Sequence, residues 1–201
     1  MDLNDIFLSV KSLFISGGFV MPPLLVCTML LWYGLGYRYW TLKETYRMGV
    51  RDMLIFYQKN PQAPVSGILD TAVKQGLALQ QQGYLNLRRH LDSAFSDYDK
   101  EMRKHAVLIK IIVMISPLLG LLGTVSGMIE TFDSLASMAL FTQSGGIAGG
   151  ISQALFTTQM GLAVAIPGVL IQSVLNRRQI NLQTDLAQVK DLLCKIGRAH
   201  V

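Results

Sequence analysis

Charged residues are scarce in this chain of 201 residues, of which they make up 15 %. Soluble domains carry about a quarter. They are absent from three stretches, 12–37, 111–129 and 134–176. A helix that crosses the hydrocarbon core of a bilayer needs roughly 20 apolar residues, and 51 % of this chain is apolar. The shortage of charge therefore argues against a soluble enzyme or a disordered chain, and it predicts a small polytopic membrane protein.

Cysteine and histidine are also rare. Cys27 lies inside the first uncharged stretch and Cys194 near the C-terminus, so they are expected in different environments. The three histidines, His90, His105 and His200, show no spacing typical of metal ligands. The chain also lacks a phosphate-binding loop, a dinucleotide fingerprint and a nucleophile elbow. These absences predict no disulfide, no metal site, no cofactor and no enzymatic activity.

The basic residues are concentrated in two segments. Residues 38–110 hold twelve Lys or Arg against seven acids, and residues 176–201 hold five against two. Basic residues that flank membrane spans stay in the cytoplasm. Three spans then place the N-terminus outside and the C-terminus inside. This orientation accounts for the net charge of +5, and no motif of a nucleic-acid-binding protein accompanies it. We therefore expect contact with membrane lipids and no nucleic acid.

These patterns predict an all-α membrane protein with three transmembrane helices and a helical cytoplasmic extension. The acidic start of the chain indicates that the first helix is a permanent span and not a cleaved signal peptide. The expected segments are an outer N-terminus (1–14), transmembrane helix 1 (15–37), a cytoplasmic helical domain (38–106), transmembrane helix 2 (107–132), an outer turn (133–146), transmembrane helix 3 (147–175) and a cytoplasmic C-terminal helix (176–201).

Apolar residues recur at helical spacing in the cytoplasmic segments. The first helix is expected to run on from the membrane and to stop before Pro61, because proline disfavours a helical residue before it. A second helix is expected over 67–82. A third begins near Leu87 and has no breaker before the second span, so we expect the two to be continuous. In the tail, a narrow apolar seam is expected either to pack only on these helices or to contact a neighbouring subunit as well. The seam consists of Leu182, Leu186, Val189, Leu193 and Ile196.

The second and third spans contain small residues that would let helices approach closely in lipid. The pairs Gly123 and Gly127, and Gly146 and Gly150, are each four residues apart. The full set of candidate helix-packing residues is Gly120, Gly123, Gly127, Gly146, Gly150, Gly161, Pro117 and Pro167.

Polar side chains at membrane depth give a sharper signal. Amides and hydroxyls are costly to bury without partners, so they tend to face a bundle interior or a wet cavity. Their pattern indicates either a lined pathway or a packed subunit interface. The candidate pathway or partner-facing residues are Ser116, Thr124, Gln153, Thr157 and Thr158. Glu130, at the outer end of the second span, is either a proton collector or an ordinary solvated carboxylate.

The same residues carry a family resemblance. The run SPLLGLLGTV at 116–125, followed by Gly127 and Met128, resembles the second-span signature of the ExbB/TolQ/MotA proton channel family. The run GISQAL at 150–155, with Thr158 and GLAVAIP at 161–167, is similar to its third-span signature. The three spans and the chain length resemble the ExbB and TolQ branches, whereas MotA-type stators have four spans.

The resemblance implies a partner and a mechanism. Subunits of this kind form a pentameric ring in the bacterial inner membrane, around the transmembrane helices of an ExbD-like dimer. The outer side is then the periplasm. Proton flow past an aspartate on the partner drives motion that a TonB-like protein carries to the outer membrane. The resemblance places Thr124 and Thr158 opposite that aspartate. A TolQ-like role in the Tol-Pal envelope system and a non-conducting membrane scaffold are the alternatives.

One residue departs from the family pattern. Many ExbB and TolQ members have a glutamate where this chain has Gln153. Glutamine keeps the size and the hydrogen-bonding groups of glutamate but does not ionise near neutral pH. If the chain conducts protons, the titrating group is therefore expected to come from the partner.

Overall fold

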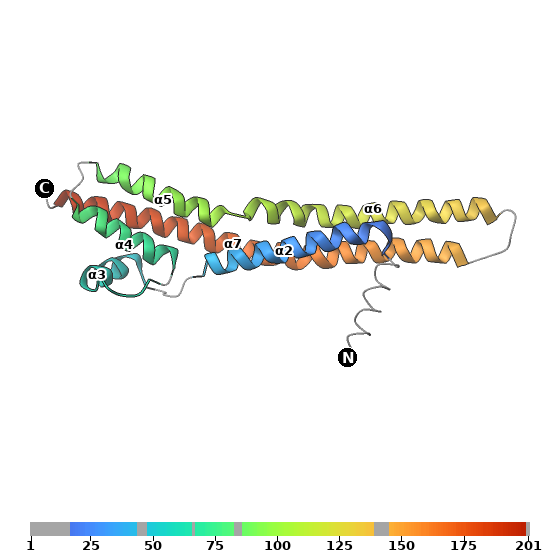
Figure 1. Cartoon of the computed structure of the whole chain (residues 1–201), viewed down its shortest axis with the longest axis horizontal. Coiled ribbons are helices and arrows are strands. Elements are labelled where there is room, and N and C mark those ends of the chain that lie inside the picture. The colour runs from blue at the N-terminus through green and yellow to red at the C-terminus, as the bar shows by residue number, and fades with distance from the viewer. Residues whose placement is uncertain (1–16, 44–47, 66, 83–85, 139–144, 200–201) are drawn as a thin grey trace, which may run out of the picture. The chain divides into compact units, whose positions relative to one another are not determined.

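The computed structural model describes residues 17–43, 48–65, 67–82, 86–138 and 145–199. All regular elements in these ranges are helical (Figure 1), which confirms the expected all-α fold. They are the 3₁₀ turn η1 (Gly18–Val20) and the helices α2 (Met21–Thr41), α3 (Val50–Lys59), α4 (Ile68–Gln81), α5 (Leu87–Arg103), α6 (Ala106–Met138) and α7 (Gly145–Ala199).

Three stretches of the described residues are long and apolar enough to cross a membrane. They are Gly18–Thr41, Leu87–Asp133 and Ala148–Lys195. The number of candidate spans agrees with the sequence, while the expected limits of each span stay a prediction. The expected outer segment 1–14 lies outside the described residues, and α6 continues to Met138, inside the expected outer turn.

The chain forms two compact units. Unit 1 combines residues 1–35 with 108–172, and unit 2 combines 36–107 with 173–201. In unit 1, α2 lies against both other helices. A Cβ placed on Gly34 of α2 would lie 3.0 Å from Ile109 of α6, and one placed on Gly168 of α7 would lie 3.0 Å from Leu31 of α2. Glycine therefore brings α2 close to α6 and α7 at these points.

In unit 2, the apolar seam of the tail packs on the helices of its own chain. Leu182, Leu186, Val189 and Leu193 are all at most 5 % exposed. A Cβ on Gly76 of α4 would overlap Leu193 of α7 at 2.5 Å. The Lys190 ammonium of α7 donates to Asp92 of α5 at 2.6 Å. The structure shows the packing within the chain, and an additional contact with a neighbouring subunit stays a prediction. The side chain of Ile196 lies outside the described residues.

The helices between the first and second spans differ from expectation at the first break. Helix α3 ends at Lys59, just before Pro61, as predicted. The helix that leaves the first span does not reach that point, because α2 ends at Thr41 and α3 begins separately at Val50. No proline lies between Thr41 and Val50, which explains why the sequence pattern did not reveal the break.

The expected continuity of the third cytoplasmic helix with the second span is wrong. Helix α5 ends at Arg103 and α6 begins at Ala106. Between them His105 has a φ of 61°, in the left-handed region, where histidine is more frequent than most residues. Its ring meets the edge of Tyr37 with centroids 4.8 Å apart, and the Tyr37 hydroxyl donates to Glu101. The break between α5 and α6 thus contains neither glycine nor proline, and it lies where His105 and Glu101 contact Tyr37 of α2.

The tail seam gives a first test of the fold. Leu193 is fully buried, so Leu193→Ala is expected to destabilise the protein by about 2–5 kcal/mol through lost contacts and a cavity. Ile180→Ala on the same helix serves as the control, because Ile180 is 61 % exposed. Thermal unfolding of the purified protein measures both, and equal melting temperatures for the two variants would contradict the packing of the seam.

Candidate functional site

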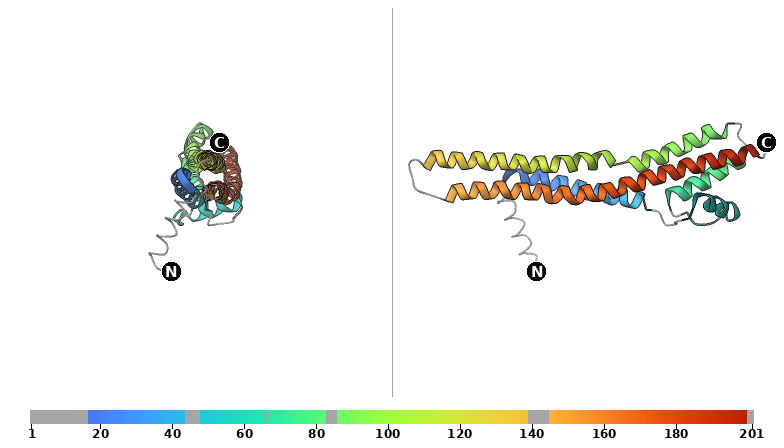
Figure 2. Two further views of the ribbon diagram at one scale, coloured as in Figure 1. Left: turned by 90° about the vertical axis from the view of Figure 1, so that its right-hand side faces the viewer. Right: turned by 180° about the vertical axis from the view of Figure 1, so that it is seen from behind.

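The backbones of α6 and α7 touch in unit 1. A Cβ on Gly161 would lie 2.7 Å from the carbonyl oxygen of Ser116, and a Cβ on Gly120 would lie 3.1 Å from that of Thr157. Neither position has room for a side chain. The two glycines therefore let the helices approach to backbone contact, the arrangement that small residues permit in lipid. The yellow part of α6 and the orange part of α7 lie side by side in Figure 2.

The contact continues towards the end of the hairpin where α6 ends and α7 begins. A Cβ on Gly127 would lie 2.8 Å from the carbonyl oxygen of Gly150. Gly123 lies against the side chain of Thr157, and Gly150 against that of Thr131. Since Gly120 meets Gly161 and Gly127 meets Gly150, α6 and α7 run antiparallel. The structure thus brings together five of the six glycines singled out from the sequence.

The other three candidate packing residues are Gly146, Pro117 and Pro167. The surroundings of Gly146 lie outside what the structure describes. Pro117 and Pro167 lie inside α6 and α7 and are partly exposed. Each proline removes one backbone donor from its helix, and both helices continue through them.

Two of the candidate pathway hydroxyls are buried in this interface. Ser116 is 0 % and Thr157 1 % exposed. The Ser116 hydroxyl donates to the carbonyl oxygen of Ile112 at 2.8 Å, and that of Thr157 to Ala154 at 2.9 Å. Each hydroxyl thus bonds within its own helix, which is how a polar group is tolerated without water. The structure places these two residues between α6 and α7, not on an open edge.

Thr124 and Thr158 are partly exposed and lie on one edge of the hairpin. The Thr158 hydroxyl donates across the interface to the carbonyl oxygen of Gly120 at 3.3 Å. The Thr124 hydroxyl donates to Leu121 at 2.6 Å. Gly123 and Thr157 face one another, and the threonine after each is turned by about 100° in the same sense. Because the helices are antiparallel, this rotation brings both threonines to the same edge.

Gln153 lies on the other side of α7. It is five residues from Thr158, which is about 140° around a helix. Its amide lies beside Gly18, at the start of the first span, so that a Cβ on Gly18 would overlap its nitrogen. The sequence grouped Gln153 with the threonines, whereas the structure separates it from the Thr124 and Thr158 edge.

Sequence reasoning missed three buried polar or charged residues. Asp70, 4 % exposed, lies on α4. Thr131, 3 % exposed, extends the α6–α7 contact. Arg38, 1 % exposed, lies in unit 2, where its guanidinium donates to Asn176 at 3.1 Å and to Gln179, both on α7. An arginine directly after an apolar stretch is typical of an interfacial anchor. The sequence therefore gives no sign that Arg38 is buried.

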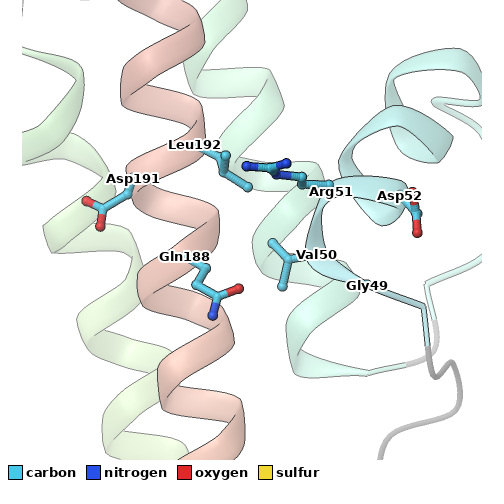
Figure 3. Close-up of a pocket in the computed structure, with 7 residues that line it drawn as sticks. All are labelled: Gly49, Val50, Arg51, Asp52, Gln188, Asp191 and Leu192. Atoms are coloured by element: carbon cyan, nitrogen blue, oxygen red, sulfur yellow. The ribbon is translucent and has the colours of Figure 1, made fainter.

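A hollow of about 540 Å³ lies in unit 2 between the start of α3 and α7. Figure 3 shows Arg51 and Leu192 pointing towards each other, while the carboxylates of Asp52 and Asp191 point apart. A binding site usually has a few converging polar groups, so this hollow is the weaker candidate. The described residues contain no cluster of potential metal ligands.

The backbone contact predicts an asymmetry between two glycines of α7. Gly161→Ala is expected to destabilise the hairpin by about 1–3 kcal/mol, because its Cβ would meet backbone atoms that cannot turn away. Gly149→Ala is the control, since a Cβ there would have nothing within 4 Å. Melting temperatures of both variants measure the difference. A Gly161→Ala protein as stable as Gly149→Ala would rule out the close approach.

Comparison with known proteins shows the family to which this hairpin belongs. The MotA/TolQ/ExbB proton channel family matches residues 61–188. A putative biopolymer transport protein, ExbB-like 3 of Synechocystis sp., is 31 % identical over 170 residues, or 79 % of this chain and 81 % of that protein. The biopolymer transport protein ExbB of Aquifex aeolicus is 31 % identical over 105 residues, covering 51 % and 70 %.

A relative from the other branch also matches. The Tol-Pal system protein TolQ of Haemophilus influenzae is 26 % identical over 149 residues, which covers 74 % of this chain and 58 % of that protein. The family match covers α4, α5, α6 and most of α7. The chain belongs to the MotA/TolQ/ExbB proton channel family, and its three long apolar helices agree with a multi-pass membrane protein.

Proposed function

We propose that this chain is an ExbB-like subunit of a proton-driven motor in the bacterial inner membrane. With an ExbD-like dimer it uses the proton motive force to energise TonB-dependent transport across the outer membrane. Five copies form a ring around the dimer, the N-terminus lies in the periplasm and the C-terminus in the cytoplasm. The chain itself is not an enzyme. The observation that carries the proposal is the pair of threonine hydroxyls at one edge of a tightly packed hairpin.

The two hydroxyls suit a proton path whose carrier belongs to another chain. No ionisable residue occurs at 111–129 or 134–176, so the lining of α6 and α7 at that depth has no side chain that titrates near neutral pH. A hydroxyl both donates and accepts hydrogen bonds. Thr124 and Thr158 can therefore hold a partner carboxylate or a water molecule, and such bonds are strong in a medium of low dielectric constant.

Adjacent threonines give a matched test. Thr158→Val is expected to lower proton flux roughly 10- to 100-fold in liposomes that hold the chain with its ExbD-like partner, since a hydrogen bond to a charged group contributes about 1.5–3 kcal/mol. Thr157→Val is expected to conduct normally, because that hydroxyl is buried and bonded to Ala154. Thr184→Val, on the exposed part of α7, is a second control.

Other results of this assay would contradict the proposal. Normal flux in Thr158→Val together with loss in Thr157→Val would place the path between the helices. Robust proton uptake by liposomes that hold only this chain would show that the carrier does not come from a partner. Each variant is also tested for co-purification of the partner, so that loss of assembly is not taken for loss of conduction.

The match to a TolQ protein supports a second candidate, a subunit of the Tol-Pal envelope system. The hairpin would work in the same way there, and only the partner would differ. Purification of the complex from its native membrane, with identification of the co-isolated small membrane subunit by mass spectrometry, distinguishes the two. An ExbD-like partner supports the TonB-linked role, and a TolR-like partner contradicts it.

A further inference from the structure

The start of the first span is built around Gly18 and the amide of Gln153. Gly18 has a φ of 57°, a conformation that residues with a side chain rarely adopt. A Cβ at Gly18 would also overlap the amide nitrogen of Gln153. The backbone therefore favours glycine at position 18, and the absence of a side chain there leaves the space that the Gln153 amide occupies.

One face of the segment that follows Gly18 is covered. Val20 is 1 %, Met21 6 % and Leu24 4 % exposed, whereas Phe19 is 60 % exposed. Burial of this kind at one end of a span indicates a fixed contact with the rest of unit 1. Gln153 is the α7 residue against which Gly18 lies.

Gln153 is also turned away from the proposed proton path. The α7 positions that face α6 include Gly150, Ala154, Thr157 and Gly161. Thr158 lies on one side of this row and Gln153 on the other, about 140° apart.

We propose that Gln153 is a positioning residue that seats the outer start of the first span on α7, and that it takes no part in proton transfer. The side chain acts by its shape and by the space that Gly18 leaves for it. The consequence is a rigid link between α2 and α7 at the outer end of unit 1.

Thiol labelling tests the seating directly and does not depend on conduction. In a background in which Cys27 and Cys194 are replaced by alanine, Val20→Cys is expected to react slowly with a thiol reagent, because residue 20 is buried. Adding Gln153→Ala or Gly18→Ala is expected to raise the labelling rate roughly tenfold, the change that corresponds to about 1.4 kcal/mol.

Matched controls exist on the same two helices. Gln159→Ala removes an exposed amide from α7, and Gly36→Ala adds a methyl group to α2 where nothing lies within 4 Å. Neither is expected to change the labelling of Val20→Cys. Gln153→Glu keeps the size of the side chain and is expected to restore most of the protection that Gln153→Ala loses.

Two results would overturn the proposal. One is rapid labelling of Val20→Cys in the background protein, which would mean that the start of the first span is not seated. The other is unchanged labelling in Gln153→Ala.

A measurement of proton flux distinguishes failure of this proposal from failure of the proposed function. It is the one test of Gln153 that depends on the proposed function. With the ExbD-like partner, Gln153→Glu is expected to leave the pH profile of proton flux unchanged. A new titration in that profile would place residue 153 in the path. If the unaltered complex does not conduct, the proposed function fails while the labelling result still decides the role of Gln153.

Discussion

The contact between Gly120 and Gly161 is the constraint on which the rest of unit 1 depends. Lipid chains are as apolar as leucine, so no hydrophobic force drives helices together within a bilayer, and association rests on packing and hydrogen bonds. A row of glycines gives α6 and α7 that packing, because the two backbones come into contact at Gly120 and Gly161 and at Gly127 and Gly150. Once the two backbones touch, the rotation of each helix is fixed, and with it the direction of every polar side chain on the hairpin.

Fixed rotation assigns different tasks to neighbouring residues. Thr157 lies in the interface with its hydroxyl bonded to Ala154, while Thr158 lies at the edge with its hydroxyl on Gly120. Gln153, on the opposite side of α7, meets the first span. Within five positions, α7 thus has one residue that packs on α6, one with a hydroxyl at the edge of the hairpin, and one that contacts the start of the first span.

The sequence predicted the number of spans, the tail seam and the packing glycines, because absence of charge and regular spacing are visible along the chain. The family resemblance singled out Thr158, but the residues alone did not show that Thr157 is buried between the helices. Which face of a helix meets a neighbour depends on that neighbour. The break at His105 had no glycine or proline to announce it, and its contact with Tyr37 comes from a residue 68 positions away. The burial of Arg38 likewise depends on Asn176 and Gln179, which the sequence places far from it.

The central claim is that the edge with Thr124 and Thr158, and not the interior with Thr157, meets the transmembrane helix of the partner. Site-specific photo-crosslinking in native membranes tests this most directly, with the reactive residue placed at position 124, 157 or 158 in turn. The account predicts adducts with the partner subunit from positions 124 and 158 and none from position 157. An adduct from position 157, with none from either of the other two, would contradict it.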